Sequence, residues 1–313
     1  MYYTTQMQEY RLESLDINNI KIQKKIKALI SESRFTRSNL NNANCELINV
    51  DNKFKINTFE DGQDPKLSEV QKLFNEIFPE EEIEPETILR SAVDGQNPWG
   101  TPDTKYRVVV VTDEDKKITA ICAGATLDID NKRNEVAYCV EYVLTKPQLR
   151  QSGLAREAYI SALIDSMKIA KEQNKKLTFL FGGCTDSSET FWNNMGWKRI
   201  YFKKGSNYIE LPYLQPILNF DTHTGEISNK SREVKEHLMI DCLVRKPTKE
   251  DMIKLQEALI NYTAMWPREA FKNNEAFIRH KVYIDNLKLK FREDLDQSDN
   301  LYFFDKQEAQ SLN

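Results

Sequence analysis

Residues 135–170 read EVAYCVEYVLTKPQLRQSGLAREAYISALIDSMKIA, and this stretch decides the fold. Its first part is a run of β-branched, aromatic and aliphatic residues. The run is too apolar for a strand with one face in water, so it predicts a central strand of a sheet. Pro147 ends that run. From Ala155 onward, small and apolar residues recur at helical spacing, which predicts a tight turn followed by a long helix.

The turn at residues 150–155 has the features of a phosphate-binding site. The first N–H groups of a helix lack intrahelical partners and carry the positive end of the helix dipole, so they stabilise an anion. Gly153 has no Cβ, which permits an unusual φ and lets an anion approach the backbone, while Arg150 and Arg156 add positive charge. The alternative is an ordinary strand–loop–helix junction that binds nothing.

Length and composition predict a globular protein with one catalytic-sized domain and additional segments. The chain has 313 residues, of which 40% are hydrophobic and 29% charged, and it has no apolar run long enough to span a bilayer. Its first residues lack the charged start and apolar centre of a signal peptide, so we expect a cytoplasmic protein.

Charge and cysteine content exclude other classes of site. A net charge of −4 argues against nucleic acid as the main partner, because phosphate backbones are bound by a concentrated basic surface. The cysteines are odd in number and widely spread, which is typical of reduced thiols, and neither they nor the three histidines have metal-ligand spacing. No metal is predicted. The cysteines are Cys45, Cys122, Cys139, Cys184 and Cys242.

We expect residues 1–60 to form an extension outside the sheet. Within it, apolar positions among lysines at residues 21–30 predict a short basic amphipathic helix, which either packs on the main domain or touches a membrane surface. A second amphipathic helix is predicted at residues 66–78. The glutamates of residues 80–86 that follow are either a solvated face or a wall that attracts a cationic substrate.

The remaining elements predict an α/β (α+β) fold with a mixed, mostly antiparallel sheet flanked by helices. Strands are expected at residues 107–112 and 118–129, so that three strands form an antiparallel meander before the long helix. Residues 176–182 predict a strand parallel to the central one, because a helix separates the two. A short helix from Ser187 or Ser188 to Gly196 and strands from Trp197, at 208–218 and at 237–244 follow.

Residues 246–313 predict a helical C-terminal extension. Thr248 and Asp251 are a plausible capping pair for its first helix, and Phe277, Ile284 and Phe291 mark a second. The two helices either dock on the sheet or make a homodimer contact.

The order of these elements resembles the GCN5-related N-acetyltransferase (GNAT) superfamily. The resemblance depends on the R-Q-S-G-L-A turn, which is similar to the family's Q/R-x-x-G-x-G/A pattern, and on the F-W-N-N-M-G-W segment after the parallel strand. It covers about residues 66–244 and implies a GNAT domain at 61–245. Fragments at residues 78–81 and 213–216 resemble a bacterial branch of the superfamily more weakly.

The resemblance implies a sheet whose parallel strands splay apart to bind acetyl-CoA, or another acyl-CoA, for transfer to an amine on a small molecule or peptide. By this resemblance, backbone groups of Tyr142, Val143 and Leu144 pair with pantetheine. Phe78 and Glu81 are expected near the substrate, and Trp192 near the CoA arm. The remaining implied cofactor-binding residues are Arg150, Gln151, Ser152, Gly153, Leu154, Ala155 and Arg156.

Glu141 is the candidate general base. A carboxylate in the strand before the turn, partly desolvated, has a raised pKa and can accept the ammonium proton of an amine. Strict alternation would place Glu141 and Cys139 on one face of the strand, and Tyr142 on the other. The alternative is that Glu141 pairs with a buried arginine or lysine.

The chain departs from the family where many members have a tyrosine that protonates the leaving thiolate. Trp192 occupies that position, and an indole N–H is not a useful acid. Tyr201, Tyr208, Tyr213 or water are candidates for the role, unless the thiolate leaves unassisted. Cys184 is a further candidate, as a nucleophile. A non-catalytic acyl-CoA-binding module and an acyl-carrier-dependent synthase therefore remain alternative functions.

Overall fold

The computed structural model describes residues 35–37, 47–49, 54–95, 104–130, 132–213, 216–227, 236–264, 266–297 and 300–312. The basic helix predicted at residues 21–30 lies outside them. The strands are β1 (Phe35–Arg37), β2 (Leu47–Asn49), β3 (Lys55–Phe59), β4 (Lys105–Thr112), β5 (Ile118–Asp130), β6 (Glu135–Thr145), β7 (Lys176–Cys184), β8 (Lys198–Lys204), β9 (Asn207–Glu210), β10 (His237–Cys242) and β11 (Leu301–Phe304). The α-helices are α3 (Leu67–Ile77), α4 (Glu86–Val93), α5 (Leu154–Glu172), α6 (Glu189–Asn194), α7 (Lys249–Thr263), α8 (Asn274–Asp296) and α9 (Lys306–Leu312).

These strands form one mixed sheet in the order β1-β2-β3-β4-β5-β6-β7-β10-β8-β11, with β9 paired to β8. Neighbours are antiparallel except β6 and β7, the one parallel pair among the described strands. The predicted mixed, mostly antiparallel sheet with a parallel pair is therefore confirmed. None of the described helices is long and apolar enough to cross a membrane.

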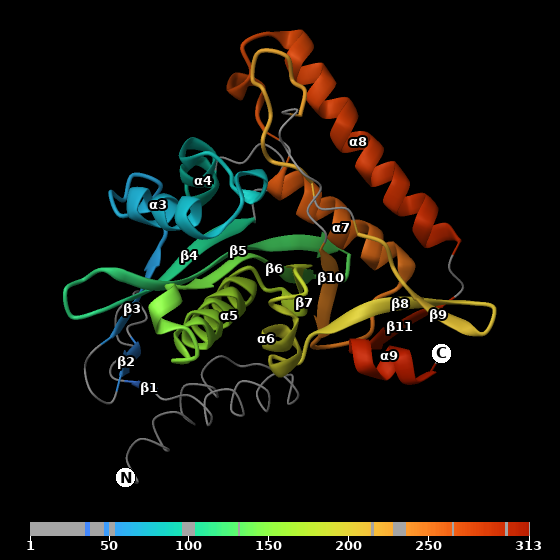
Figure 1. Cartoon of the computed structure of the whole chain (residues 1–313), viewed down its shortest axis with the longest axis horizontal. Coiled ribbons are helices and arrows are strands. Elements are labelled where there is room, and N and C mark those ends of the chain that lie inside the picture. The colour runs from blue at the N-terminus through green and yellow to red at the C-terminus, as the bar shows by residue number, and fades with distance from the viewer. Residues whose placement is uncertain are drawn as a thin grey trace.

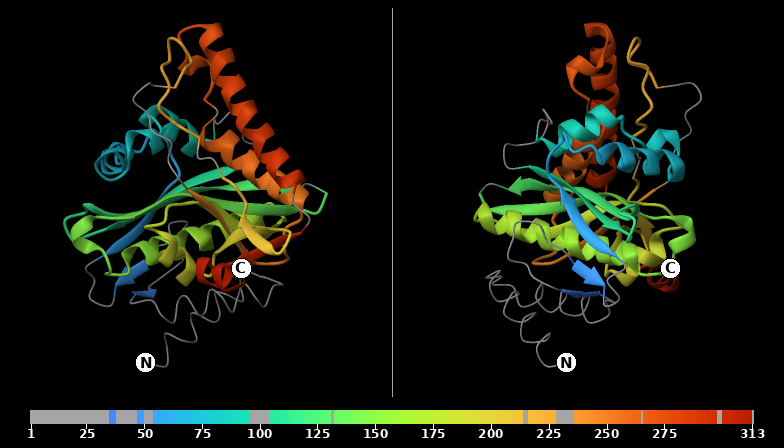
Figure 2. Two further views of the ribbon diagram at one scale, coloured as in Figure 1. Left: turned by 45° about the vertical axis from the view of Figure 1, so that its right-hand side comes forward. Right: turned by 90° about the vertical axis from the view of Figure 1, so that its left-hand side faces the viewer.

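Helices cover both faces of the sheet, and each face has its own core (Figure 1). Helices α3, α4 and α7 lie on one face, where Phe74, Leu89 and Leu255 are buried against the strands. Helices α5 and α6 lie on the other, with Tyr159 and Trp192 in the core. Helix α8 rises away from the sheet beyond α7 (Figure 2).

The parallel pair opens part-way along its length, as the resemblance implied. Strand β6 pairs with β7 from Glu135 to Cys139, where the register ends opposite Phe181. On its other edge β7 pairs with β10 from Phe179 to Cys184, so residues 182–184 of β7 keep that neighbour after the pairing with β6 has ended. Close packing fixes the strands at the opening, because a Cβ on Gly182 of β7 would lie 2.5 Å from the carbonyl oxygen of Val140. The second half of β6 is thus free to pair with something other than β7.

A β-bulge in β6 at Glu141 changes which residues face each core. On β5, Ala123 pairs with Tyr142 and the adjacent Gly124 with Val140, so Glu141 is the extra residue. Tyr142 consequently lies in the same core as Cys139, and the predicted placement on the opposite face is wrong. Gly124 accommodates the bulge, since a Cβ there would lie 2.2 Å from the carbonyl oxygen of Cys139.

Both segments predicted to be extensions contribute strands to the sheet. Strand β3 pairs with β4, so the expectation that residues before Phe59 stay outside the sheet is wrong for Lys55–Phe59. Strand β11 pairs with β8. The strand expected at 208–218 extends only over Asn207–Glu210.

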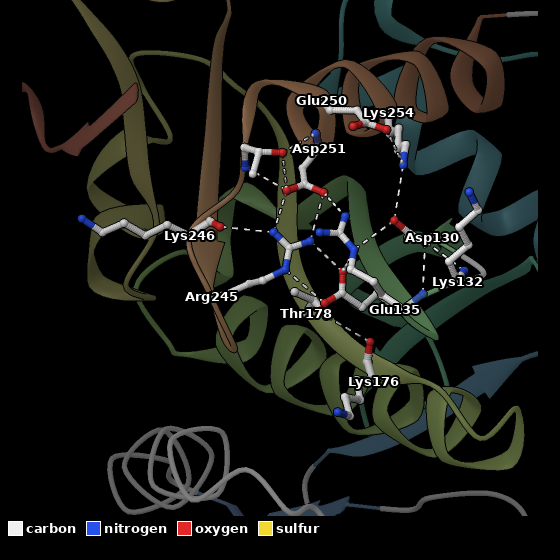
Figure 3. Close-up of polar contacts among 12 residues, drawn as sticks. Asp130, Lys132, Glu135, Lys176, Thr178, Arg245, Lys246, Glu250, Asp251 and Lys254 are labelled. Atoms are coloured by element: carbon white, nitrogen blue, oxygen red, sulfur yellow. Dashed lines mark hydrogen bonds and ion pairs between the residues drawn. The ribbon is translucent and has the colours of Figure 1, made fainter. Parts of the chain in front are cut away.

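Helix α7 docks on the sheet through its capped first turn. Thr248 and Asp251 form the predicted capping box, which is confirmed. The Asp251 side chain, 1% exposed, also pairs with Arg245 at 2.6 Å and with Arg133 at 2.5 Å. Arg245 in turn holds Glu135, the first residue of β6, at 2.6 Å (Figure 3). We call Glu135, Arg245, Asp251 and Arg133 the docking network.

Candidate active site

A cavity of about 620 Å³ lies where β6 separates from β7. The free half of β6, residues 140–145, forms one part of its lining, and Gly183 at the end of β7 forms another. Arg150, Gln151 and Ala155 line it from the turn before α5. The cavity therefore joins the open strand edge to the start of the helix, as the sequence predicted.

The turn before α5 has two residues in the left-handed region and leaves the start of the helix without a side-chain cap. Gly153 is the N-cap of α5 at φ 90°, Gln151 has φ 65°, and no side chain caps the helix. Both φ values lie in the left-handed region, which favours glycine. A Cβ on Gly153 would meet nothing within 4 Å, so the space in front of this turn is open.

A second cavity of about 550 Å³ continues from the first along this turn. Thr145, Gln151, Ala155 and Phe191 line both, and Arg156 lines the second. An open strand edge, an uncapped helix N-terminus and basic side chains suit a pantetheine arm and a pyrophosphate. The residues present therefore fit a coenzyme A derivative.

Other residues of the turn hold it in shape. The Ser152 hydroxyl donates a hydrogen bond to the Leu149 carbonyl at 2.6 Å, and the Leu154 side chain is buried in the α5 core. Only the backbone groups of these two residues are suited to an anion.

Glu141 lies in the bulge and lines the cavity. Its Oε2 accepts a hydrogen bond from the Tyr106 hydroxyl at 2.5 Å, and its Oε1 has no partner among the described residues. Burial raises the pKa of Glu141 to about 7, and the hydrogen bond from Tyr106 offsets only part of that rise. In the described part of the chain no arginine or lysine pairs with Glu141, so the alternative of a buried ion pair has no support there.

A second buried carboxyl, Glu84, lies near Glu141; it belongs to the predicted acidic run, although the sequence gave no sign that it is buried. Its side chain is 4% exposed, and its Oε1 has no partner in the described ranges. Burial and the charge of Glu141 together raise its pKa well above the ordinary value. Two carboxyls in this setting do not ionise together readily, so the pair retains a proton near neutral pH.

A second acidic pair, Glu82 and Glu236, also lines the cavity. Burial raises the pKa of Glu236 to about 8, with the charge of Glu82 adding to the effect. Glu82 belongs to the predicted acidic run, whereas Glu236 directly precedes β10 and gave no signal in the sequence. The Glu236 carboxyl lies against Gly183, where a Cβ would approach its Oε2 to 2.0 Å.

The acidic run and the residues next to it do not all lie at the cavity. Phe78 lines the cavity, with its ring 5.4 Å from that of Tyr142. Glu81 accepts a backbone hydrogen bond from Leu218 and is absent from the described lining. Glu86 instead bonds to Arg90 on the surface of α4. The run is thus neither wholly a solvated face nor wholly a wall.

Of the three candidate tyrosines, Tyr213 is the one among the described lining residues. Tyr208 packs edge-on against Tyr302 of β11, and the ring centroids of Tyr201 and Phe304 are 6.0 Å apart. Burial and the charges of Glu236 and Glu141 raise the pKa of Tyr213 well above 10, so its hydroxyl stays protonated.

Trp192 both lines the cavity and packs in the core, with its ring 4.3 Å from that of Trp197. The Cys184 thiol is buried, and its pKa is raised well above the ordinary value, which opposes a nucleophilic role. The structure shows no group of three or more potential metal-ligating side chains within the residues it describes.

No protein-family model and no curated protein sequence matches this chain. Solved structures do align with it. A GNAT-family acetyltransferase from Staphylococcus aureus Mu50 is 13% identical over 60% of this chain and 99% of its own, with a TM-score of 0.36. A soil-metagenome aminoglycoside acetyltransferase is 15% identical over 47% and 89%, with a TM-score of 0.35. A chimera of Vibrio cholerae spermidine N-acetyltransferase is 14% identical over 61% and 96%, with a TM-score of 0.37. All three of these solved structures are described as acetyltransferases, the first of them as a member of the GNAT family.

Proposed function

We propose that this chain is an acyl-CoA-dependent N-acyltransferase that transfers an acetyl-sized group to a primary amine. One observation carries the proposal: Glu141 lies in a bulge at the point where β6 leaves β7, in the cavity that also reaches the uncapped N-terminus of α5. Binding of the donor and removal of a proton are thereby possible in one groove.

The donor is held by backbone groups in this proposal. The first amides of α5, from Gly153 onward, bind the pyrophosphate, and Arg150 and Arg156 add charge. The free edge of β6 at Tyr142, Val143 and Leu144 pairs with the amides of pantetheine as an added strand would. The acyl-CoA supplies an activated thioester.

Glu141 acts as the general base. An amine enters the cavity mostly as an ammonium ion, which cannot attack a carbonyl, and Glu141 takes its proton through Oε1, the oxygen without a partner in the described residues. A pKa of about 7 suits this task, because the carboxylate is substantially ionised at neutral pH and still basic enough to accept the proton.

Tyr213 is the candidate to assist the leaving thiolate. Its side chain lines the cavity and its hydroxyl stays protonated at neutral pH, so it can stabilise the thiolate by donating a hydrogen bond. Trp192 cannot replace it as an acid, since its ring packs in the α5 core.

The test is to incubate the protein with acetyl-CoA and a panel of primary amines while following the release of free thiol. We expect turnover with at least one amine, and a decrease in kcat of about 100-fold or more in Glu141→Gln. Calorimetric titration with CoA is the control, because this variant should keep the wild-type affinity. Tight CoA binding without turnover on any amine would instead indicate a non-catalytic binding module.

A further inference from the structure

Three carboxyl groups line the cavity, those of Glu82, Glu141 and Glu236, and a fourth, Glu84, is buried nearby. The Glu141 carboxyl accepts a hydrogen bond from Tyr106 of β4, whereas the Glu236 carboxyl lies against Gly183 at the end of β7. The charge of Glu82 raises the pKa of Glu236 after burial has done so, and the charge of Glu141 does the same for Glu84. We therefore treat the carboxyls as two pairs, Glu141 with Glu84 and Glu82 with Glu236.

No described residue provides a counter-charge for the pair Glu82 and Glu236. Neither side chain has a hydrogen bond or ion pair with any other described residue, although both line the cavity. Arg150 is the one basic residue in the described lining, and it belongs to the turn before α5. Elsewhere the fold neutralises its buried carboxylates, as Asp251 in the docking network shows.

The other pair contains a more deeply buried group without a partner. Glu84 is 4% exposed, and its Oε1 has no partner in the part of the chain that the structure describes. A buried carboxylate is destabilising unless it is paired, so a cation at Glu141 would allow both carboxyls of this pair to ionise.

Apolar side chains line the same cavity as the two pairs. Phe78 and Ile77 come from the end of α3, Leu218 from the segment after Tyr213, and Leu259 from α7. A ligand that fills this space is in contact with hydrocarbon as well as with carboxylates. Leu259 belongs to the predicted C-terminal extension, so that extension contributes to the lining of the cavity.

We propose that the acceptor is a dication, in which a primary amine at Glu141 is joined by an alkyl spacer to a second cationic nitrogen held by Glu82 and Glu236. This inference rests on the proposed function. The spacer contacts Phe78, Leu218 and Leu259, and the second nitrogen supplies the positive charge that the Glu82 and Glu236 carboxylates lack among the described residues. A monoamine would bind at Glu141 but would leave Glu82 and Glu236 without a cation.

The test is calorimetric binding to the full chain saturated with CoA. The probes are α,ω-diaminoalkanes of increasing length, each compared with the n-alkylamine of the same carbon number. We expect the best diamine to bind about ten-fold or more tightly than its monoamine, since a hydrogen bond to a charged group contributes about 1.5 to 3 kcal/mol. The optimal length then reports the separation of the two pairs.

Variants locate the second nitrogen. Glu236→Gln and Glu82→Gln should each reduce the preference for the diamine to a few-fold, because they weaken binding of the diamine more than binding of the monoamine. Glu80→Gln is the matched control, because Glu80 belongs to the same acidic run, is exposed and does not line the cavity, so the preference should persist.

Equal affinity for diamines and monoamines would overturn the inference, as would a preference that survives Glu236→Gln and Glu82→Gln. Turnover assays separate this failure from that of the proposed function. Monoamine turnover without a diamine preference contradicts only the dication. Selective diamine binding without acyl transfer to any amine contradicts the acyltransferase and leaves the dication site supported.

Discussion

Strand β6 carries a carboxylate near each end of its core-lining run, Glu135 at its first residue and Glu141 in its bulge. At the first end, Arg245 holds Glu135 at 2.6 Å and Asp251 at 2.6 Å, and Arg133 pairs with Asp251 as well. At the other end, Glu141 accepts one hydrogen bond from a neutral tyrosine.

The electrostatic consequences of the two settings are opposite. Burial alone would raise the pKa of Asp251, but hydrogen bonds from Arg245 and Thr248 lower it well below the ordinary range. Burial raises the pKa of Glu141 to about 7, and Tyr106 cannot reverse that. Paired carboxylates fasten α7 to the sheet, whereas the unpaired carboxylate remains able to exchange a proton.

Removing Arg245 should leave the carboxylates at the start of β6 without their main partner. We expect Arg245→Met to lower the free energy of unfolding by about 2 to 3 kcal/mol, because Glu135 and Asp251 would lose their main partner. Urea denaturation measures this. Lys254→Met is the control, since its exposed pairs with Asp130 and Glu250 contribute about 0.5 kcal/mol. Equal losses in the two variants would contradict the comparison.

The unpaired carboxyl of Glu141 should make the stability of the protein depend on pH. The pKa of Glu141 in the folded state lies above its ordinary 4.5. The contribution of this carboxyl to the free energy of unfolding is therefore fully present below about pH 4.5 and is lost as the pH rises through about 7. The free energy of unfolding of wild type should therefore fall by about 2 kcal/mol more than that of Glu141→Gln when the pH rises from about 5 to about 8.

Thermal or urea unfolding across this pH range measures the effect. The effect of Asp251 on the pH dependence has the opposite sign. Because the pKa of Asp251 is lowered, its contribution to the free energy of unfolding is present above the ordinary pKa of 3.8 and is lost as the pH falls. A Glu141→Gln curve parallel to wild type would show that this carboxyl is not desolvated.

At the open end of β6, the anion is expected to bind to backbone groups rather than to a buried counter-charge. Gly153→Val should weaken CoA binding about ten-fold or more, because a branched side chain at φ 90° strains the turn and occupies the space in front of the amides.

Gly205→Val is the control for backbone strain. Gly205 lies between β8 and β9 at φ 64°, and a Cβ there would also meet nothing within 4 Å. The two variants should lose similar stability, but only Gly153→Val should lose affinity for CoA in calorimetry. The same loss of affinity in both would remove the turn from the site.

The smallest effect is expected at Tyr213. Tyr213→Phe should lower kcat by a few-fold to about ten-fold, because water can partly replace the hydroxyl as a donor. Tyr201→Phe should leave kcat unchanged, since Tyr201 packs near β11 and is not part of the described lining. Steady-state kinetics with saturating acetyl-CoA distinguishes them.

Local patterns in the sequence predicted the meander, the turn at Gly153, the long helix and the cap at Thr248, because propensity and turn chemistry act over a few residues. The bulge at Glu141 was not predictable in this way. It depends on Gly124 in one neighbouring strand and Gly182 in the other, which only the folded sheet brings together. The error in the facing of Tyr142 follows directly from it.

The burial of Glu84 and the position of Glu236 were not predictable for a related reason. Glu84 belongs to the acidic run of residues 80–86 and Glu236 is a single glutamate, and nothing local distinguishes either of them from surface residues. Glu236 reaches the cavity because β10 pairs with β7, a contact between segments far apart in the chain. Glu84 is buried because the loop between η1 (Glu80–Glu82) and α4 packs near Tyr142.

The position of β10 has a consequence for folding kinetics. In the sheet it lies between β7 and β8, although it follows both in the chain. Strand β8 therefore joins the sheet through β10, and β11 joins it through β8. This half of the sheet depends on loop closures over long stretches of chain, which slow folding. We expect the meander and α5 to form first, so that the donor groove takes shape before β10 brings Glu236 to the cavity.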